Sequence, residues 1–148
     1  MTQVFSGSDH AGFRLKELLR EHVVDQGFEV EDLGAFDAET SVDYPEFGKK
    51  VGEKVAAHPG SFGIVVCGSG IGISIAANKV AGVRAALVHD VTTAGLARLH
   101  NDANVLALGA RVVGEEVARN AVDTFLHTDF EGGRHERRVE QLNSMSCQ

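Results

Sequence analysis

Cys67 is the side chain in this sequence that is best placed to do chemistry. It ends an apolar run, Phe62 to Cys67, and is followed at once by the glycine loop, residues 68–72, with the sequence Gly-Ser-Gly-Ile-Gly. The run predicts a buried strand, and residues 71–79 predict a helix that begins inside the loop. Backbone N–H groups at a helix start favour negative charge, so this position favours a reactive thiolate and an anionic ligand.

A second group of polar residues follows the first apolar run, Val4 to Ser8, which ends in Asp9 and His10. In an open parallel sheet, ligands bind beyond the carboxyl ends of the strands, where the strand order reverses. In the flavodoxin-like order 2-1-3-4-5, that point lies between the first and third strands. We therefore predict one cleft, with a carboxylate and an imidazole on one wall and the Cys67 thiol with the glycine loop on the other.

Each of these residues also has a purely structural explanation. Cys67 could be a small core residue, and Asp9 could cap the following helix, alone or in addition to a ligand contact. His100, near the end of the helix predicted over residues 91–101, could simply interact favourably with the C-terminal end of that helix. Arg134 and Arg138 are four residues apart, so on a helix they would lie on one face. There they could bind one phosphate together or form a solvated basic face.

The elements that must position these residues follow an alternating pattern. Apolar runs alternate with segments of helical period, which predicts a single α/β domain, residues 1–148, with a doubly wound five-stranded parallel sheet covered on both faces. Strands are predicted near residues 4–8, 29–33, 63–67, 84–88 and 105–108, and helices near 11–26, 46–57, 71–79, 91–101, 115–127 and 134–143. In the first helix Leu15, Leu19 and Val23 share the apolar face and Lys16 belongs to the polar face. Gly27 ends that helix, and residues 37–44 are expected to form a loop over one end of the sheet.

Composition narrows the class of protein. The chain has 148 residues, 43% of them apolar, which suits one soluble domain with its own core. The net charge of −7 argues against a nucleic-acid surface. No run reaches the ~20 apolar residues of a membrane span, and two cysteines, Cys67 and Cys147, make no disulfide framework. We therefore expect a cytoplasmic protein that binds neither membrane nor nucleic acid.

The glycine loop alone would also suit a nucleotide-binding module. It departs from the dinucleotide fingerprint at Ile73, where the third glycine would stand, yet Asp90, about twenty residues on, resembles the acid that holds a ribose hydroxyl. This alternative stays open. A P-loop is excluded, because no Gly-Lys followed by Ser or Thr ends the motif.

The remaining histidines are expected at the surface or in packing contacts; they are His22, His58, His89, His127 and His135. No pair has the spacing of a known metal motif, so we predict neither a metal nor a cofactor.

Several segments together resemble the ribose-5-phosphate isomerase B family, in order and at family spacing over nearly the whole chain. They are Asp9-His10-Ala11-Gly12, the Val66–Ser74 segment with Ala76-Ala77-Asn78-Lys79, His100-Asn101-Asp102, Leu108-Gly109-Ala110-Arg111, and Glu131-Gly132-Gly133-Arg134-His135 followed by Arg138. The resemblance implies a metal-free aldose–ketose isomerase that interconverts ribose 5-phosphate and ribulose 5-phosphate. Galactose-6-phosphate and allose-6-phosphate isomerases look similar, so a six-carbon sugar phosphate is the alternative substrate.

The resemblance also implies a role for each matching residue. Cys67 would carry a proton between neighbouring sugar carbons, and His100 would open the sugar ring while Asp9 orients the hydroxyls. The enediolate intermediate would be stabilised by N–H groups around Gly68, Ser69, Gly70, Ile71 and Gly72. Ser69 stands where many members have threonine, which keeps a hydroxyl for the enediol oxygens. The substrate phosphate would be shared by His10, Arg111, Arg134 and Arg138, with Asn101 and Tyr44 lining the pocket. Ile73 occupies the position where some members without the cysteine carry a glutamate, so the chain resembles the cysteine type.

Topology predicts how the site is completed. Helix C-termini point to the sheet edge opposite the carboxyl ends of the strands, so His100 and Asn101 cannot easily reach Cys67 of their own chain. They should enter a partner's site, which predicts a homodimer with shared active sites, or a tetramer built on it, as the resemblance also implies. A non-catalytic scaffold subunit is the third hypothesis, and the intact set of Asp9, Cys67 and His100 speaks against it.

Overall fold

Five short strands form one parallel sheet in the computed structural model, which describes residues 2–145. The strands are β1 (Gln3–Ser8), β2 (Glu29–Asp32), β3 (Phe62–Cys67), β4 (Ala85–Leu87) and β5 (Val105–Gly109). Each lies within about two residues of its predicted position, and every pairing is parallel. The prediction of a doubly wound α/β domain is confirmed.

The strand order is β2-β1-β3-β5-β4, which differs from the flavodoxin-like order 2-1-3-4-5 that the sequence analysis considered. β5, rather than β4, lies beside β3, with Val66 opposite Leu108 in the register. The physical reason is burial: every residue of β5 is buried, whereas the shorter β4 is only half-buried throughout and therefore suits the sheet edge. β1 and β3 are neighbours as predicted, so the inference about their adjoining ends is unaffected.

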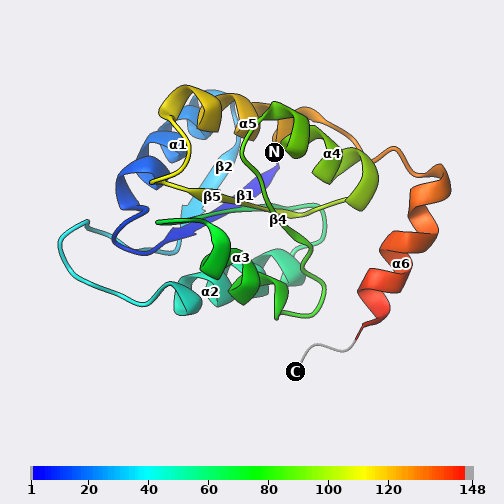
Figure 1. The fold of residues 1–148 in the computed structure, drawn as a ribbon, viewed down its shortest axis with the longest axis horizontal. Helices are drawn as coiled ribbons and strands as arrows, with labels where there is room; N and C mark the ends of the chain where they lie inside the picture. The colour runs from blue at the N-terminus through cyan, green and yellow to red at the C-terminus, as the bar shows by residue number, and fades with distance from the viewer. Residues whose placement is uncertain (1, 146–148) are drawn as a thin grey trace.

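Helices cover both faces of the sheet (Figure 1). α1 (Phe13–Asp25), α4 (Val91–Asn101) and α5 (Glu115–His127) pack on one face, and α2 (Tyr44–Ala57) and α3 (Ile71–Asn78) pack on the other. Each layer has its own apolar core against the sheet. A short 3₁₀ turn, η1 (Gly133–His135), leads into α6 (Glu136–Ser144), which stands apart from these layers at the side of the molecule.

Lys16 does not lie on a polar face of α1, as the sequence analysis predicted, but is fully buried. Its Nζ atom donates to Asp32 Oδ1 at 2.7 Å and to the carbonyl oxygen of Ala35 at 2.5 Å. The ammonium group can be buried because two oxygens satisfy it there, one from the last residue of β2 and one from the segment after it. Helical period alone carries no information about that distant segment.

Other boundaries need small corrections. Gly27, with φ of +95°, follows the end of α1 as predicted. α2 begins at Tyr44 rather than Glu46, and the predicted last helix is split, with Arg134 in η1 and Arg138 in α6. Cys147 lies outside the described residues. None of the helices between residues 2 and 145 combines the length and hydropathy that a bilayer-spanning segment needs.

Candidate active site

Cys67 ends β3 with a side chain that is 3% exposed. The backbone N–H of Gly70 donates a hydrogen bond to its Sγ atom at 3.2 Å. Within the same loop, the N–H of Ile71 donates to Ser69 Oγ at 3.2 Å. The predicted arrangement of a thiol against a backbone donor at the start of a helix is therefore present.

The glycine loop can take this position because it packs backbone against backbone. Gly70 has φ of +79°, and a Cβ atom there would lie 2.7 Å from the carbonyl carbon of Leu108. A Cβ atom at Gly109 would collide with the carbonyl oxygen of Ser69. Only residues without a side chain allow the loop to rest on the end of β5, so these glycines set the position of the N–H groups around Cys67.

Asp9 joins the end of β1 to the end of β3. Its backbone N–H donates to the carbonyl oxygen of Val66 at 3.3 Å, and its carboxylate Oδ1 accepts a hydrogen bond from the N–H of Gly12 at 2.9 Å. Asp9, 7% exposed, therefore holds the turn that leads into α1, but it does not cap the helix as predicted, because the N-cap is Gly12 and has no side-chain cap. Contact with substrate stays a prediction. Beside it, His10 Nδ1 accepts a hydrogen bond from the N–H of Val42 at 3.1 Å, which ties the loop after β2 to the same edge.

Tyr44 and Arg111 reach the glycine loop from other parts of the chain. The tyrosine ring lies on Gly72, where a Cβ atom would collide with it. The N–H of Arg111 donates to the carbonyl oxygen of Gly68 at 2.9 Å, and its guanidinium lies against the open side of Gly68. One edge of the sheet thus gathers a group that we call the thiol half-site: Asp9, His10, Tyr44, Cys67, residues 68–72 and Arg111.

The other predicted residues gather where α4 ends. His100 stacks on His135, with ring centroids 4.2 Å apart and planes at 16°. The N–H of Glu131 donates to the carbonyl oxygen of Leu99 at 3.1 Å and holds the segment before η1 on α4. Arg138 Nη1 donates to the carbonyl oxygen of Arg134 at 3.1 Å. We call this second group the histidine half-site: His100, Asn101, Arg134 and Arg138.

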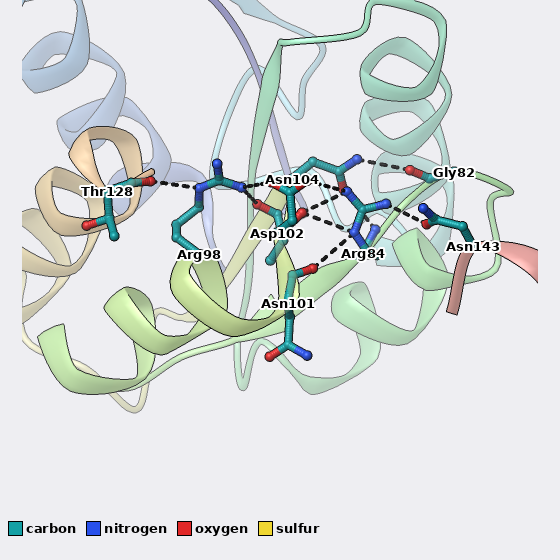
Figure 2. A network of polar contacts seen from close by, with 9 residues as sticks. Gly82, Arg84, Arg98, Asn101, Asp102, Asn104, Thr128 and Asn143 are labelled. Atoms are coloured by element: carbon teal, nitrogen blue, oxygen red, sulfur yellow. Dashed lines mark hydrogen bonds and ion pairs between the residues drawn. The ribbon is translucent and has the colours of Figure 1, made fainter. Parts of the chain in front are cut away.

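A polar network positions the end of α4 (Figure 2). Arg84 Nε donates to the carbonyl oxygens of Asn101 and Asp102 at 3.1 and 3.0 Å, and Arg98 Nη1 donates to Asp102 Oδ1 at 2.8 Å. Figure 2 shows the side chain of Asn101 pointing away from this network, with only its carbonyl engaged. Sequence reasoning gave no role to Arg84 or Arg98, although the spacing of Arg98 and Asp102 by four at the end of a predicted helix was a signal for their ion pair. Asp102, with φ of +46°, ends α4 in the left-handed region.

Within one chain, the thiol half-site lies at the carboxyl ends of the strands and the histidine half-site lies toward their amino ends. The segment after α4 meets the beginning of β3, where the carbonyl oxygen of Asn104 accepts a hydrogen bond from the N–H of Gly63 at 2.8 Å. Cys67 lies at the other end of that strand, about 13 Å further along at ~3.3 Å per residue. The structure therefore brings together the residues within each half-site but does not bring His100 to Cys67 of the same chain.

The nucleotide alternative finds little support in this arrangement. Asp90 caps α4, because its Oδ1 accepts hydrogen bonds from the N–H and hydroxyl of Thr93 at 2.7 and 2.8 Å. These bonds lower the pKa of Asp90 below its ordinary 3.8, the backbone bond most strongly. β5 also separates β4 from the glycine loop after β3, so Asp90 is not where a ribose-binding acid would stand.

Comparison with known proteins agrees with the family resemblance. The family model described as Ribose/Galactose Isomerase matches residues 4–142. The chain belongs to this isomerase family. Among its relatives, ribose-5-phosphate isomerase B of Escherichia coli K12 is 46% identical over 145 residues, covering 98% of this chain and 97% of the relative.

Solved structures of the isomerase family share the fold throughout. Ribose-5-phosphate isomerase B of Clostridium thermocellum superposes with a TM-score of 0.93 at 49% identity, covering 96% of this chain and 95% of the other. The Mycoplasma genitalium isomerase B with bound ribulose-5-phosphate gives a TM-score of 0.93 at 44% identity, covering 96% and 94%.

Proposed function

We propose that this chain is a ribose-5-phosphate isomerase, which interconverts ribose 5-phosphate and ribulose 5-phosphate through an enediolate with Cys67 as the base. The observation that carries the proposal is the hydrogen bond from the Gly70 N–H to Cys67 Sγ at the carboxyl end of β3, beside Asp9. It is supported by membership of the isomerase family and by 46% identity to the E. coli isomerase B. The Mycoplasma relative carries ribulose-5-phosphate, the product that we assign here.

The chemistry begins with ring opening, which requires a proton to move at the ring oxygen, and we assign this step to His100. The Cys67 thiolate then removes the proton from the carbon next to the sugar carbonyl, and the C–H electron pair forms the enediolate double bond. The same thiol returns the proton to the neighbouring carbon. A proton also passes from the hydroxyl on the carbon that was deprotonated to the former aldehyde oxygen, so that the hydroxyl becomes the ketone and the aldehyde becomes an alcohol. Backbone N–H groups of the glycine loop and the Ser69 hydroxyl stabilise the oxyanion that develops between these steps.

The substrate phosphate is assigned to His10 and Arg111 on one side and to Arg134 and Arg138 on the other. Guanidinium groups suit a phosphate because their N–H donors can bind two of its oxygens at once. Asp9 would orient the sugar hydroxyls, while Tyr44 and Asn101 would line the pocket.

The assignment requires both half-sites in one catalytic centre. Because they lie at opposite edges of the sheet in one chain, we propose a homodimer in which the histidine half-site of each chain completes the thiol half-site of its partner. A tetramer built from such dimers would satisfy the same requirement. We place the protein in the cytoplasm, since a catalytic thiol must stay reduced.

The decisive experiment compares wild type with Cys67→Ala in the presence of a chelator, by following ribulose 5-phosphate formation from ribose 5-phosphate. We expect wild-type turnover to survive the chelator, and kcat to fall by at least about 1,000-fold in Cys67→Ala, because the proton transfer loses its base. Cys67→Ala should keep its far-UV circular dichroism, because the side chain is small and ends a strand. A folded variant that kept most of its activity would refute the cysteine base. Turnover of six-carbon sugar phosphates in place of ribose 5-phosphate would refute the substrate.

A further inference from the structure

Three side chains with metal-binding atoms converge beside the histidine half-site. Their ligand atoms are His100 Nε2, Glu131 Oε2 and His135 Nε2, and all three lie within 4.8 Å of one another. Glu131 Oε2 is 4.0 Å from His100 Nε2 and 3.9 Å from His135 Nε2. The two imidazole rings are nearly parallel, and both present Nε2 toward the same carboxylate.

His135 supplies an independent reason to look for a ligand here. Its side chain is only 9% exposed, and its Nε2 atom is buried without a hydrogen-bond partner. A buried polar atom without a partner calls for an explanation, because burial removes its hydrogen bonds to water and nothing replaces them. Burial, the largest cause, and the nearby charges of His100 and Arg134 lower the pKa of His135 below its ordinary 6.5, while Glu131 raises it.

We propose that His100, Glu131 and His135 form a binding site for a transition-metal cation of the zinc class, and that an ion bound there inhibits the enzyme. Two imidazoles and one carboxylate are a ligand set that suits Zn²⁺, with a fourth position left for water. Tetrahedral ligands at about 2.0–2.1 Å from the metal lie roughly 3.3–3.4 Å from one another. The 3.9 and 4.0 Å separations therefore need to contract by about 0.6 Å. The His100 ring must also turn out of its stack on His135, because a metal binds in the plane of each imidazole and the planes of two stacked rings do not meet at one ion.

Two of the three ligands are exposed enough to make these movements. His100 and Glu131 have side chains that are 37% and 55% exposed, so they can move toward the buried His135 without disturbing the core. Arg134 and Arg138 follow on the same segment and oppose an added positive charge. We therefore expect affinity on the order of micromolar rather than that of a structural zinc site.

A bound metal would inhibit the enzyme because it occupies the lone pair of His100 Nε2. This part of the inference rests on the proposed function, in which His100 opens the sugar ring. A metal on His100 Nε2 occupies the nitrogen that would exchange a proton with the ring oxygen of the sugar. The ion is thus not a cofactor, and removing it should raise activity rather than abolish it.

Metal binding is tested without any assay of activity. Purified Cys67→Ala/Cys147→Ser protein, which removes both thiols as competing ligands, is titrated with Co²⁺ while the visible absorption of a tetrahedral site is recorded. It is also titrated with Zn²⁺ by calorimetry. We expect about one ion per chain. His135→Gln and Glu131→Gln in the same background should each weaken binding by at least about tenfold, since even changes outside the first ligand shell cost 10–100-fold. His89→Gln, at an exposed histidine, is the matched control and should bind as its parent does.

The outcomes separate the site from the proposed function. No binding, equal binding by folded His135→Gln, or equal weakening by His89→Gln would overturn the metal site, whatever the activity. If the metal binds as expected, wild type should lose isomerisation of ribose 5-phosphate as Zn²⁺ is added and regain it with a chelator. Binding at the site with unchanged turnover would overturn the inhibition alone.

Discussion

The ammonium group of Lys16 ties α1 to the segment that follows β2. It is fully buried, its partner Asp32 is 18% exposed, and it also donates to the carbonyl oxygen of Ala35. We predict that Lys16→Met lowers the free energy of unfolding by about 2–3 kcal/mol, because it leaves a buried carbonyl without a donor and Asp32 without its partner. Urea unfolding followed by circular dichroism measures this.

The matched control is Lys54→Met. Lys54 pairs with Glu31 at 3.5 Å, but both side chains are almost half exposed, so its loss should change stability by no more than about 0.5 kcal/mol. Equal effects of the two substitutions would mean that burial of Lys16 contributes nothing.

Individual residues also mark where sequence reasoning could succeed. Cys67, Asp9 and the glycine loop were predictable, because their chemistry follows from the ends of two strands that were themselves easy to recognise. The stack of His100 on His135 was not, since it joins positions 35 residues apart through a turn whose path depends on the Glu131 backbone. A pattern within one helix cannot report such a contact.

At the scale of elements, the turn from β3 into α3 depends on Gly70. We predict that Gly70→Ala reduces kcat/KM about 100-fold, because a methyl group 2.7 Å from the carbonyl carbon of Leu108 must push the loop, and with it the donor to Cys67, out of place. Gly27→Ala is the control: its φ is also positive, at +95°, but nothing lies within 4 Å of the added carbon. It should lower the melting temperature through backbone strain and leave kinetics unchanged. Similar kinetics for both variants would show that the close packing of the loop is irrelevant to catalysis.

The start of α4 makes a pH-dependent contribution. The lowered pKa of Asp90 means that its carboxylate stabilises the fold fully above the ordinary 3.8 and loses this effect as pH falls through the lower, folded value. We predict that Asp90→Asn melts about 1–3 °C below wild type near pH 7, and that the gap narrows as the pH falls below 3.8. A gap that stayed constant over this range would show that charge is not involved.

The elements themselves were largely predictable from period and composition, but the strand order was not. β4 and β5 are both short apolar runs, and nothing in either run says which will lie beside β3. That choice depends on how completely each strand is buried once α3, α4 and α5 are in place, which only the folded molecule determines.

At the scale of the whole molecule, the separation of the two half-sites allows a direct test of whether each active site is shared between two chains of a dimer. We predict that inactive Cys67→Ala and inactive His100→Ala chains, unfolded together and refolded as an equal mixture, recover about a quarter of wild-type activity. Random pairing makes half of the dimers mixed, and each mixed dimer has one centre with both residues intact. Each variant refolded alone is the control. A mixture as inactive as its components would refute shared centres.

The strand order has a further consequence for a chain that is made from its N-terminus onward. β4 has β5 as its strand neighbour in the sheet, so residues 85–87 leave the ribosome before the strand on which they will pair exists. α4 can form in the meantime, but β4 can pair with β5 only after residue 109 has emerged. At ~5–20 residues per second, that is about 1–5 seconds after residue 87 has emerged. The nascent protein therefore carries an unpaired apolar strand for that interval, while β1, β2 and β3 can already pair with one another.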